Sequence, residues 1–262
     1  MKVVLLAFGM IWLYLALLFV LTLIGAAVPL LKTGFKSSWI PLLLAFSGAF
    51  LLGISTLHLM PESFHEVGHQ AGLYILIGFF LQLLLQKLSH GAEHGHVHVH
   101  EHEGGQHAHT VWPILAGLSI HAFMEGIPLG FNYQSGSTLP SIFLGVAAHK
   151  IPEAITLSVL LLSAGIVRRK IWWSVLLFAM VSPLAGILAL VFGQKFFLIS
   201  SILTSIIPIV IGAFLHIATT ILYESGTRKH ELSRQKVIAV LLGLGFALLT
   251  LLFGAHEAHT IH

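Results

Sequence analysis

The chain contains no cysteine among its 262 residues. This absence excludes disulfide bonds and metal sites built from thiolate sulfur, so any metal ligand must offer nitrogen or oxygen. Charged side chains are also scarce, at 9% of residues, whereas soluble proteins carry about 25%. Together with a hydrophobic content of 56% and a mean hydropathy of +0.94, this scarcity excludes an ordinary soluble domain and indicates a membrane protein.

The hydrophobic residues gather in eight runs, which suits membrane-spanning helices of about 20 residues each. The first run, at residues 3–31, is longer than the apolar part of a cleaved signal peptide, which has about 7–15 residues, so we expect it to be the first span. The sequence predicts an all-α membrane protein with a single transmembrane domain over residues 1–262. The predicted helices cover residues 5–30, 39–60, 71–88, 111–132, 140–166, 171–192, 198–223 and 237–254.

The few basic residues are divided unevenly between the two sides of such a bundle. Eight spans place both termini on one side, and the loops of the opposite side hold ten Lys or Arg residues against two. Basic residues are enriched in cytoplasmic loops, so we expect an inner (cell) membrane protein with both termini extracytoplasmic. Trp39, Trp112 and the neighbours Trp172 and Trp173 stand at the cytoplasmic starts of even-numbered helices, where an aromatic belt is expected.

Two copies of one pattern lie inside these hydrophobic runs. The pattern His-x-x-x-Glu occurs at His121 and Glu125 and again, 28 residues later, at His149 and Glu153. Residues four apart share one face of an α-helix, so each helix presents an imidazole and a carboxylate together. Ionisable groups at membrane depth cost about 2.5–3.5 kcal/mol each on insertion scales and by default mark a functional site. We predict that the two pairs face each other and hold one divalent metal ion.

The proposed ligands also indicate which metal they hold. Two imidazoles and two carboxylates suit Zn²⁺, and also Fe²⁺, Mn²⁺, Co²⁺ or Cd²⁺. Two carboxylates balance the charge of a divalent ion, which reduces the cost of placing that ion in a low dielectric. Near this site, Gly126 and Gly130 favour close packing of the fourth helix on a neighbour, either within one chain or between two subunits.

The second helix carries a third His-x-x-x-Glu pattern, at His58 and Glu62, followed by His65 and His69. If the helix persists past Pro61, these four side chains line one face. We interpret them as an entrance ladder at the extracytoplasmic end, with His58 deepest and a candidate fifth ligand of the metal. The isolated His216 of the seventh helix is more typical of a hydrogen bond between helices.

These motifs resemble those of the ZIP family of metal transporters. The resemblance rests on His58-Leu-x-Pro-Glu62, on His121-x-x-x-Glu125-Gly and on His149-Lys-x-Pro-Glu153, with Ser182-Pro-Leu in the sixth helix also similar. It implies uptake of Zn²⁺ or a related ion toward the cytoplasm, a metal site between the fourth and fifth helices, and homodimers. It further implies a 3+2+3 arrangement, in which helices 1–3 and 6–8 form an inverted repeat, and an elevator-like motion of the central pair.

The chain departs from the family pattern beside both histidines. Some members hold two metals, using an Asn after the first His, an Asp after the second and an acidic residue in the sixth helix. Ala122 and Lys150 stand at the first two places, and the sixth helix has no acid. We therefore predict one transported metal, with the ammonium of Lys150 replacing the second ion and pairing with Glu153 three residues later. Alternatively, Lys150 points into a water-filled cavity.

Histidines also crowd the loop after the third helix, at residues 90–110. Its polar, glycine-containing composition predicts a disordered cytoplasmic segment, and clustered histidine is typical of metal binding. We interpret the loop as an acceptor or sensor of imported metal, with its densest stretch at His94, His96, His98, His100 and His102.

Two other functions use the same residue types. An intramembrane zinc hydrolase would hold a fixed metal that activates water, but no His-Glu-x-x-His motif is present. A haem-binding electron carrier needs no carboxylate beside its axial histidines. We expect no enzymatic activity; the expected partners are divalent metal ions, the lipid bilayer and a second copy of the chain, and no nucleic acid.

Overall fold

The computed structural model describes residues 2–31, 39–89, 107–131, 139–193, 205–226 and 233–258, and every regular element within these ranges is a helix. The all-α prediction is therefore confirmed. The helices are α1 (Lys2–Leu31), α2 (Ile40–Ile54), the π-helical turn η2 (Ser55–Leu59), α3 (Met60–Val67), α4 (Gln70–Ser89), α5 (His107–Phe131), α6 (Leu139–Ser163), α7 (Arg168–Gly193), α9 (Ile206–Gly226) and α10 (Arg234–Ala258).

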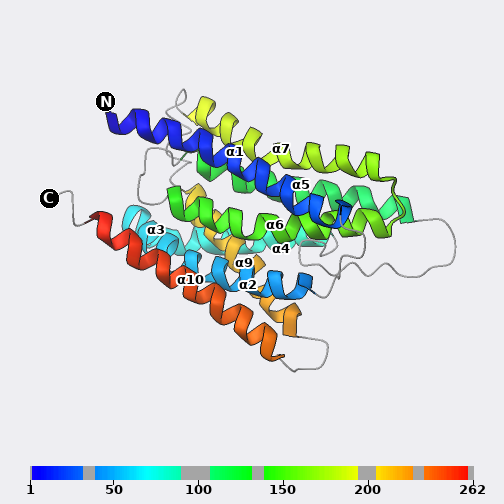
Figure 1. Ribbon diagram of the computed structural model, residues 1–262. Helices are drawn as coiled ribbons and strands as arrows, with labels where there is room; N and C mark the ends of the chain where they lie inside the picture. Colours follow the sequence, from blue (N-terminus) through cyan, green and yellow to red (C-terminus); the bar gives the residue numbers. More distant parts are fainter. Residues whose placement is uncertain are drawn as a thin grey trace.

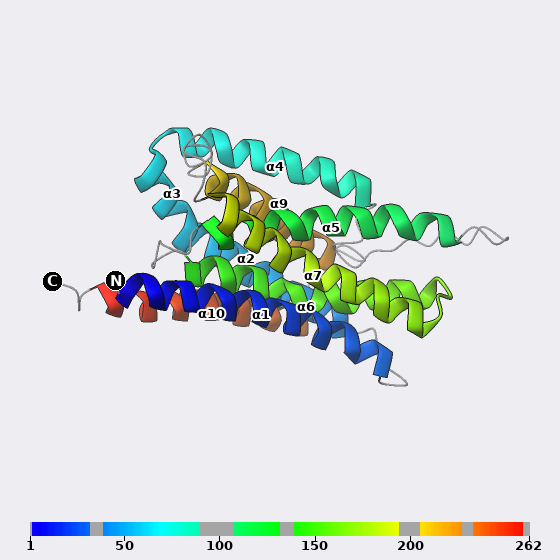
Figure 2. The ribbon, with the colours of Figure 1, turned by 90° about the horizontal axis from the view of Figure 1, so that it is seen from above.

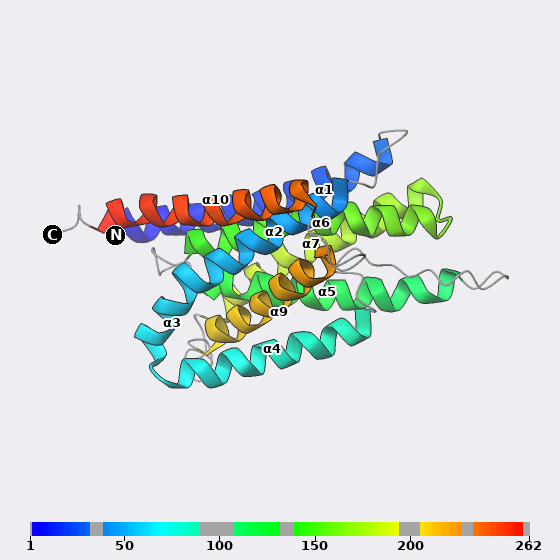
Figure 3. The ribbon, with the colours of Figure 1, turned by 90° about the horizontal axis from the view of Figure 1, so that it is seen from below.

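Seven helical stretches in the described residues are long and apolar enough to cross a membrane, with α2, η2 and α3 forming one of them. The predicted eighth span falls on α10, which is outside those seven. All three ribbon views place the start of α1 and the end of α10 at the same end of the bundle (Figures 1, 2 and 3). This placement agrees with an even number of crossings.

Several helix boundaries differ from the sequence prediction. α6 ends at Ser163 rather than at residue 166, because Gly165 takes a left-handed conformation with φ of +74°. The amide of Ile166 donates to the carbonyl of Leu161 and that of Gly165 to Leu162, which is a Schellman ending. α5 begins at His107, inside the segment predicted to be disordered. Residues 198–204 of the predicted seventh span lie outside the described residues.

The helices pack as two groups (Figure 1). The α5/α6 group consists of α1, α5, α6 and α7, and one buried apolar cluster, from Ala26 to Phe178, lies wholly within it. The α2/α9 group consists of the continuous α2–η2–α3 helix with α4, α9 and α10. The groups meet where α2 packs on α6, where α4 packs on α5 and where α9 touches α5.

The pairing of helices within the two groups follows a pattern compatible with the predicted inverted repeat. α1 packs on α6 as α7 packs on α5, and α2 packs on α10 as α9 packs on α4. The tetrapeptide Gly-Ala-Phe-Leu also occurs at residues 48–51 in α2 and again at 212–215 in α9, which are corresponding helices of the two predicted halves.

The glycines of α5 pack against α7 of the same chain. A Cβ at Gly126 would collide with the carbonyl of Ser182, and a Cβ at Gly130 with the carbonyl of Gly186. The hydroxyl of Ser182 donates to the carbonyl of Ala122 at 2.8 Å. These contacts answer the question that the sequence left open: in this structure the two glycines serve packing within one chain, and they bring the backbone of α5 close to that of α7.

Candidate metal centre

The two His-x-x-x-Glu motifs lie on α5 and α6, deep inside the bundle. His121 and Glu125 of α5 and His149 and Glu153 of α6 are each exposed by 4% or less. Both helices continue through the prolines that follow or lie within the motifs. Residues four apart in each motif therefore lie on the same face of the helix. Nε2 of His121 lies 2.5 Å from the Oε1 atom of Glu125.

Three of the four side chains converge on one point. Ligand atoms of His121, Glu125 and His149 all lie within 4.8 Å of one another. Nε2 of His149, on the other helix, also contacts Oε1 of Glu125. The structure therefore brings together both imidazoles and the first carboxylate, whereas Glu153, the fourth predicted ligand, is outside this group.

The hydrogen-bond partner of Nδ1 in each imidazole ring shows that Nε2 is the nitrogen available to bind a metal. Nδ1 of His149 donates to the carbonyl of Gly145 at 2.9 Å, and Nδ1 of His121 donates to Oε1 of Gln82 at 3.3 Å. Metal-ligating histidines characteristically donate their other ring N–H in this way. Because Nδ1 is the donor in both rings, the two Nε2 lone pairs and a carboxylate oxygen point toward the same position, an arrangement of bases that suits a cation.

Lys150 supplies a positive charge beside this position. Its Nζ donates to Oε2 of Glu125 at 2.7 Å and to Oε2 of Glu153 at 2.8 Å, and the residue is 1% exposed. The same atom lies 5.3 Å from the centre of the Phe178 ring. With neutral imidazoles, the two carboxylates and the ammonium carry a formal charge of −1. The protein would therefore balance only part of the charge of a divalent cation.

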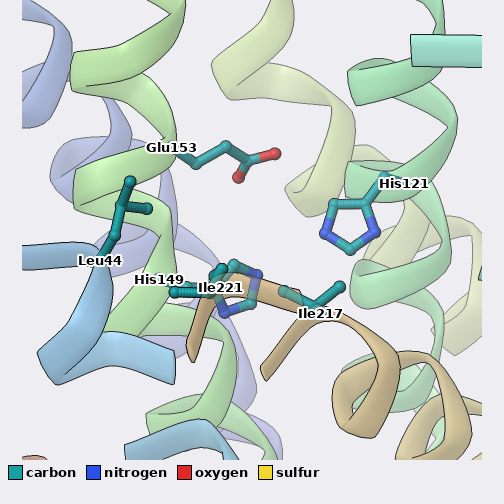
Figure 4. A pocket seen from close by; sticks show the side chains of 6 residues that line it. All are labelled: Leu44, His121, His149, Glu153, Ile217 and Ile221. Atoms are coloured by element: carbon teal, nitrogen blue, oxygen red, sulfur yellow. The ribbon is translucent and has the colours of Figure 1, made fainter. Parts of the chain in front are cut away.

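Glu153 lines the cavity beside the three converging ligands. Oε1 of Glu153 is buried and accepts no hydrogen bond from the described residues. Glu153, His121 and His149 line a cavity of about 10 Å³, roughly the space of one water molecule. Figure 4 shows the two imidazole rings and the carboxylate around this space, with apolar side chains from the α2/α9 group closing it: Leu44, Ile217 and Ile221.

The predicted entrance residues lie apart from this centre. His58 is half-buried in the π-helical turn and does not belong to the three converging ligands. The helix continues past Pro61 as far as Val67, but it ends at Gly68, where φ is +64°. His69 therefore falls in the turn rather than on the helix face. Glu62 is half-buried and His65 is exposed.

His216, Gln82 and the loop histidines are the remaining polar residues to compare with the sequence prediction. His216 forms a hydrogen bond between helices, with its Nε2 2.6 Å from Oε1 of Gln86 on α4, as its isolated position predicts. Gln82 was not among the residues predicted from the sequence. Gln82 and Gln86 are polar residues four apart in an apolar helix, and this spacing could have indicated a polar face directed into the bundle. The loop histidines lie outside the described residues: His94, His96, His98, His100 and His102.

Comparison with known proteins places these features in a family. A family model described as ZIP zinc transporter matches residues 8–111 and 89–252. Zinc transporter ZIP9-B of Xenopus laevis is 28% identical over 201 residues, which cover 68% of this chain and 65% of that protein. Zinc transporter ZIP9 of Micropogonias undulatus is also 28% identical over 201 residues, covering 70% and 64%. The matched region thus spans less than two thirds of the length of these curated relatives.

Proposed function

The chain belongs to the ZIP zinc transporter family, and from that premise we propose that it is a carrier that moves Zn²⁺ across the membrane through the site between α5 and α6. The observation that carries this proposal is the convergence of two imidazole Nε2 atoms on Oε1 of Glu125. Nitrogen and carboxylate donors of this kind bind Zn²⁺, and Fe²⁺, Mn²⁺, Co²⁺ or Cd²⁺ accept similar sets.

The proposed site holds one ion at a time, bound by His121, Glu125 and His149 with Oε1 of Glu153 completing the set. The second oxygen of each carboxylate is bound by Lys150, so the ammonium takes the place of a second metal. Lys150 also reduces the net negative charge at the site, which lowers its attraction for a divalent ion. A lower affinity suits a carrier, because the ion must also be released.

The position of the cavity supports movement toward the cytoplasm. Leu44 lies near the start of α2 and Ile221 near the end of α9, and both line the cavity. The distribution of basic residues assigns these two helix ends to the cytoplasmic face. We infer an inward-directed path from the site, with both termini extracytoplasmic and the histidine-rich loop on the cytoplasmic side, where it meets the imported metal.

The two helix groups suggest how access to the site alternates. All four proposed ligands belong to the α5/α6 group, whereas Leu44, Ile217 and Ile221 belong to the α2/α9 group. Movement of one group against the other would expose the ion to each side in turn, as secondary transporters do. Inverted halves supply the two related conformations that such movement needs.

The structure gives no support to the two alternative functions. A hydrolase needs room for a substrate beside the metal, but the cavity at the described site measures about 10 Å³, which admits one water-sized group. A haem group is also much larger than this cavity. The curated relatives are named as transporters rather than enzymes.

Metal flux into proteoliposomes tests the proposal. Purified wild-type protein should take up Zn²⁺ in a saturable manner, and Glu125→Ala and Glu153→Ala should each abolish that uptake. Glu66→Ala is the matched control, because Glu66 is an exposed glutamate of α3 and should leave uptake unchanged. Tightly retained zinc without flux would instead indicate a fixed catalytic metal, and a visible haem spectrum would indicate the electron carrier.

A further inference from the structure

Gln82 is a buried polar residue in a helix that is otherwise largely exposed. Only 28% of the most apolar stretch of α4 is buried, yet Gln82 is 0% exposed. Burying an amide is costly unless it is hydrogen-bonded. Its Oε1 accepts a hydrogen bond from Nδ1 of His121 at 3.3 Å. The Gln82 amide therefore contacts a ligand of the proposed metal site.

We propose that Gln82 is a positioning residue for His121 and that it couples metal binding to the contact between the two helix groups. The inference rests on the proposed function. By holding the proton on Nδ1, Gln82 leaves Nε2 of His121 as the lone pair that faces Glu125. Outer partners of this type fix the ring orientation and raise the basicity of the ligand.

The two histidines differ in where their outer partner is located. Nδ1 of His149 donates to the carbonyl of Gly145, one turn earlier in the same helix. The partner of His121, by contrast, is on α4, in the other helix group. Gly145 therefore moves with His149 in any rigid movement of the α5/α6 group, whereas Gln82 does not move with His121.

A conformational dependence of metal affinity follows from this difference. When α5 is packed on α4, both imidazoles are held by an acceptor and the ion is bound most tightly. When the α5/α6 group shifts away from α4, His121 loses its acceptor while His149 keeps its own. The ion is then bound less tightly, because a ligand lacking its outer partner is less basic and less well oriented. Differential affinity between two conformations is what allows an ion to shift their populations.

The test compares equilibrium Zn²⁺ binding by purified full-length variants in detergent, measured by competition with a fluorescent zinc chelator. Gln82→Leu removes the acceptor and should raise the Kd about 10- to 100-fold. Gln82→Glu keeps an acceptor oxygen at the same reach and adds negative charge, so it should bind Zn²⁺ at least as tightly as the wild type. Gln86→Leu is the matched control, because Gln86 contacts His216 rather than His121, and its Kd should not change.

Zinc flux adds a readout that general structural damage would not reproduce. Gln82→Leu should raise the KM for Zn²⁺ while the maximal rate is kept, whereas a misfolded protein loses maximal rate. If Gln82→Leu does not fold, Gln82→Asn serves instead, because its amide is one methylene too short to reach His121.

Two results would overturn the inference: an unchanged Kd in Gln82→Leu, or an equal loss of affinity in Gln82→Leu and Gln82→Glu. Failure of the proposed function is distinguishable, because the wild-type protein itself would then show no saturable Zn²⁺ uptake.

Discussion

At the scale of single residues, Lys150 has the most unusual position in the molecule. It is among the largest fully buried side chains, and it donates to both proposed carboxylate ligands. A buried charge is tolerated only when paired and hydrogen-bonded, and here each charge depends on the others. In the absence of metal, the ammonium keeps Glu125 and Glu153 from facing each other as two unbalanced carboxylates.

Removing this ammonium should destabilise the metal-free protein. Lys150→Met leaves the buried carboxylates without their cation, and breaking a buried ion pair costs about 3–5 kcal/mol. We expect a lower unfolding temperature than wild type in EDTA, and a larger stabilisation by added Zn²⁺ than wild type shows, because the ion then supplies the missing charge. Thermal unfolding of the detergent-solubilised protein, with and without Zn²⁺, measures both quantities. Equal zinc-dependent shifts in the variant and wild type would contradict the assigned role.

Placing a carboxylate at the same position should change the stoichiometry of metal binding. Wild-type protein should bind one transported ion, whereas Lys150→Asp should bind two, because an acidic residue then stands where the ammonium was. Metal content after equilibrium dialysis gives the stoichiometry, with the histidine-rich loop deleted (residues 94–109) in both proteins so that only the membrane site is counted. Two metals in the wild-type site would contradict the substitute-cation hypothesis.

At the scale of helices, the packing of α5 on α7 determines where His121 and Glu125 lie. Gly126 and Gly130 allow the backbones to approach until their α-carbons face the carbonyls of Ser182 and Gly186. No larger residue leaves room for this approach. The two glycines, four residues apart, therefore belong to the architecture of the site, although neither carries a functional group.

Substituting one of these glycines should therefore be costly. Gly130→Val forces a branched side chain against the carbonyl of Gly186, and overpacking of this kind costs about 1–3 kcal/mol. The expected result is a lower unfolding temperature together with reduced Zn²⁺ uptake, because α5 must shift away from α7. Gly245→Ala is the control, since a Cβ there meets no atom within 4 Å and an exposed helix favours Ala over Gly. Comparable losses in both variants would exclude a specific helix contact.

At the scale of the whole molecule, the proposed site lies at the boundary between two helix groups. The ligands lie on one side of this boundary, while Gln82 and the apolar wall of the cavity lie on the other. Part of the boundary is apolar, because α2 and α6 contribute to one common hydrophobic cluster. Apolar surfaces make few directional bonds, so such a boundary suits sliding of one group against the other.

The absence of cysteine allows this movement to be followed with single introduced thiols. Leu44→Cys, in the cavity wall, should react with a membrane-impermeant maleimide added from the cytoplasmic side when movement of the α5/α6 group opens the cavity to that side. Zn²⁺ should change the rate because it shifts the conformational equilibrium. Leu18→Cys provides the control, because Leu18 is 0% exposed and does not line the cavity. Inside-out and right-side-out vesicles distinguish the two faces. Labelling of Leu44→Cys from the outer face alone would contradict the inward path.

The sequence by itself determined the local features of this protein. Hydropathy and the lack of charge predict an all-helical membrane protein, and the spacing of His121 and Glu125 already places both on one helix face, because such patterns depend only on neighbours along the chain. The sequence also indicated the pairing of Lys150 with Glu153, three residues away, and the contact of His216 with another helix.

Only the tertiary structure decided which of these local features meet. It directs both Nε2 atoms to one oxygen of Glu125, joins Lys150 to Glu125 as well as to Glu153, and leaves His58 and His69 outside the ligand cluster. It also identifies Gln82, 39 residues before His121, as a partner of the site. These contacts join different helices, so they depend on the distance between the helices and on the rotation of each helix about its axis. The periodicity of a single helix determines neither the distance nor the rotation.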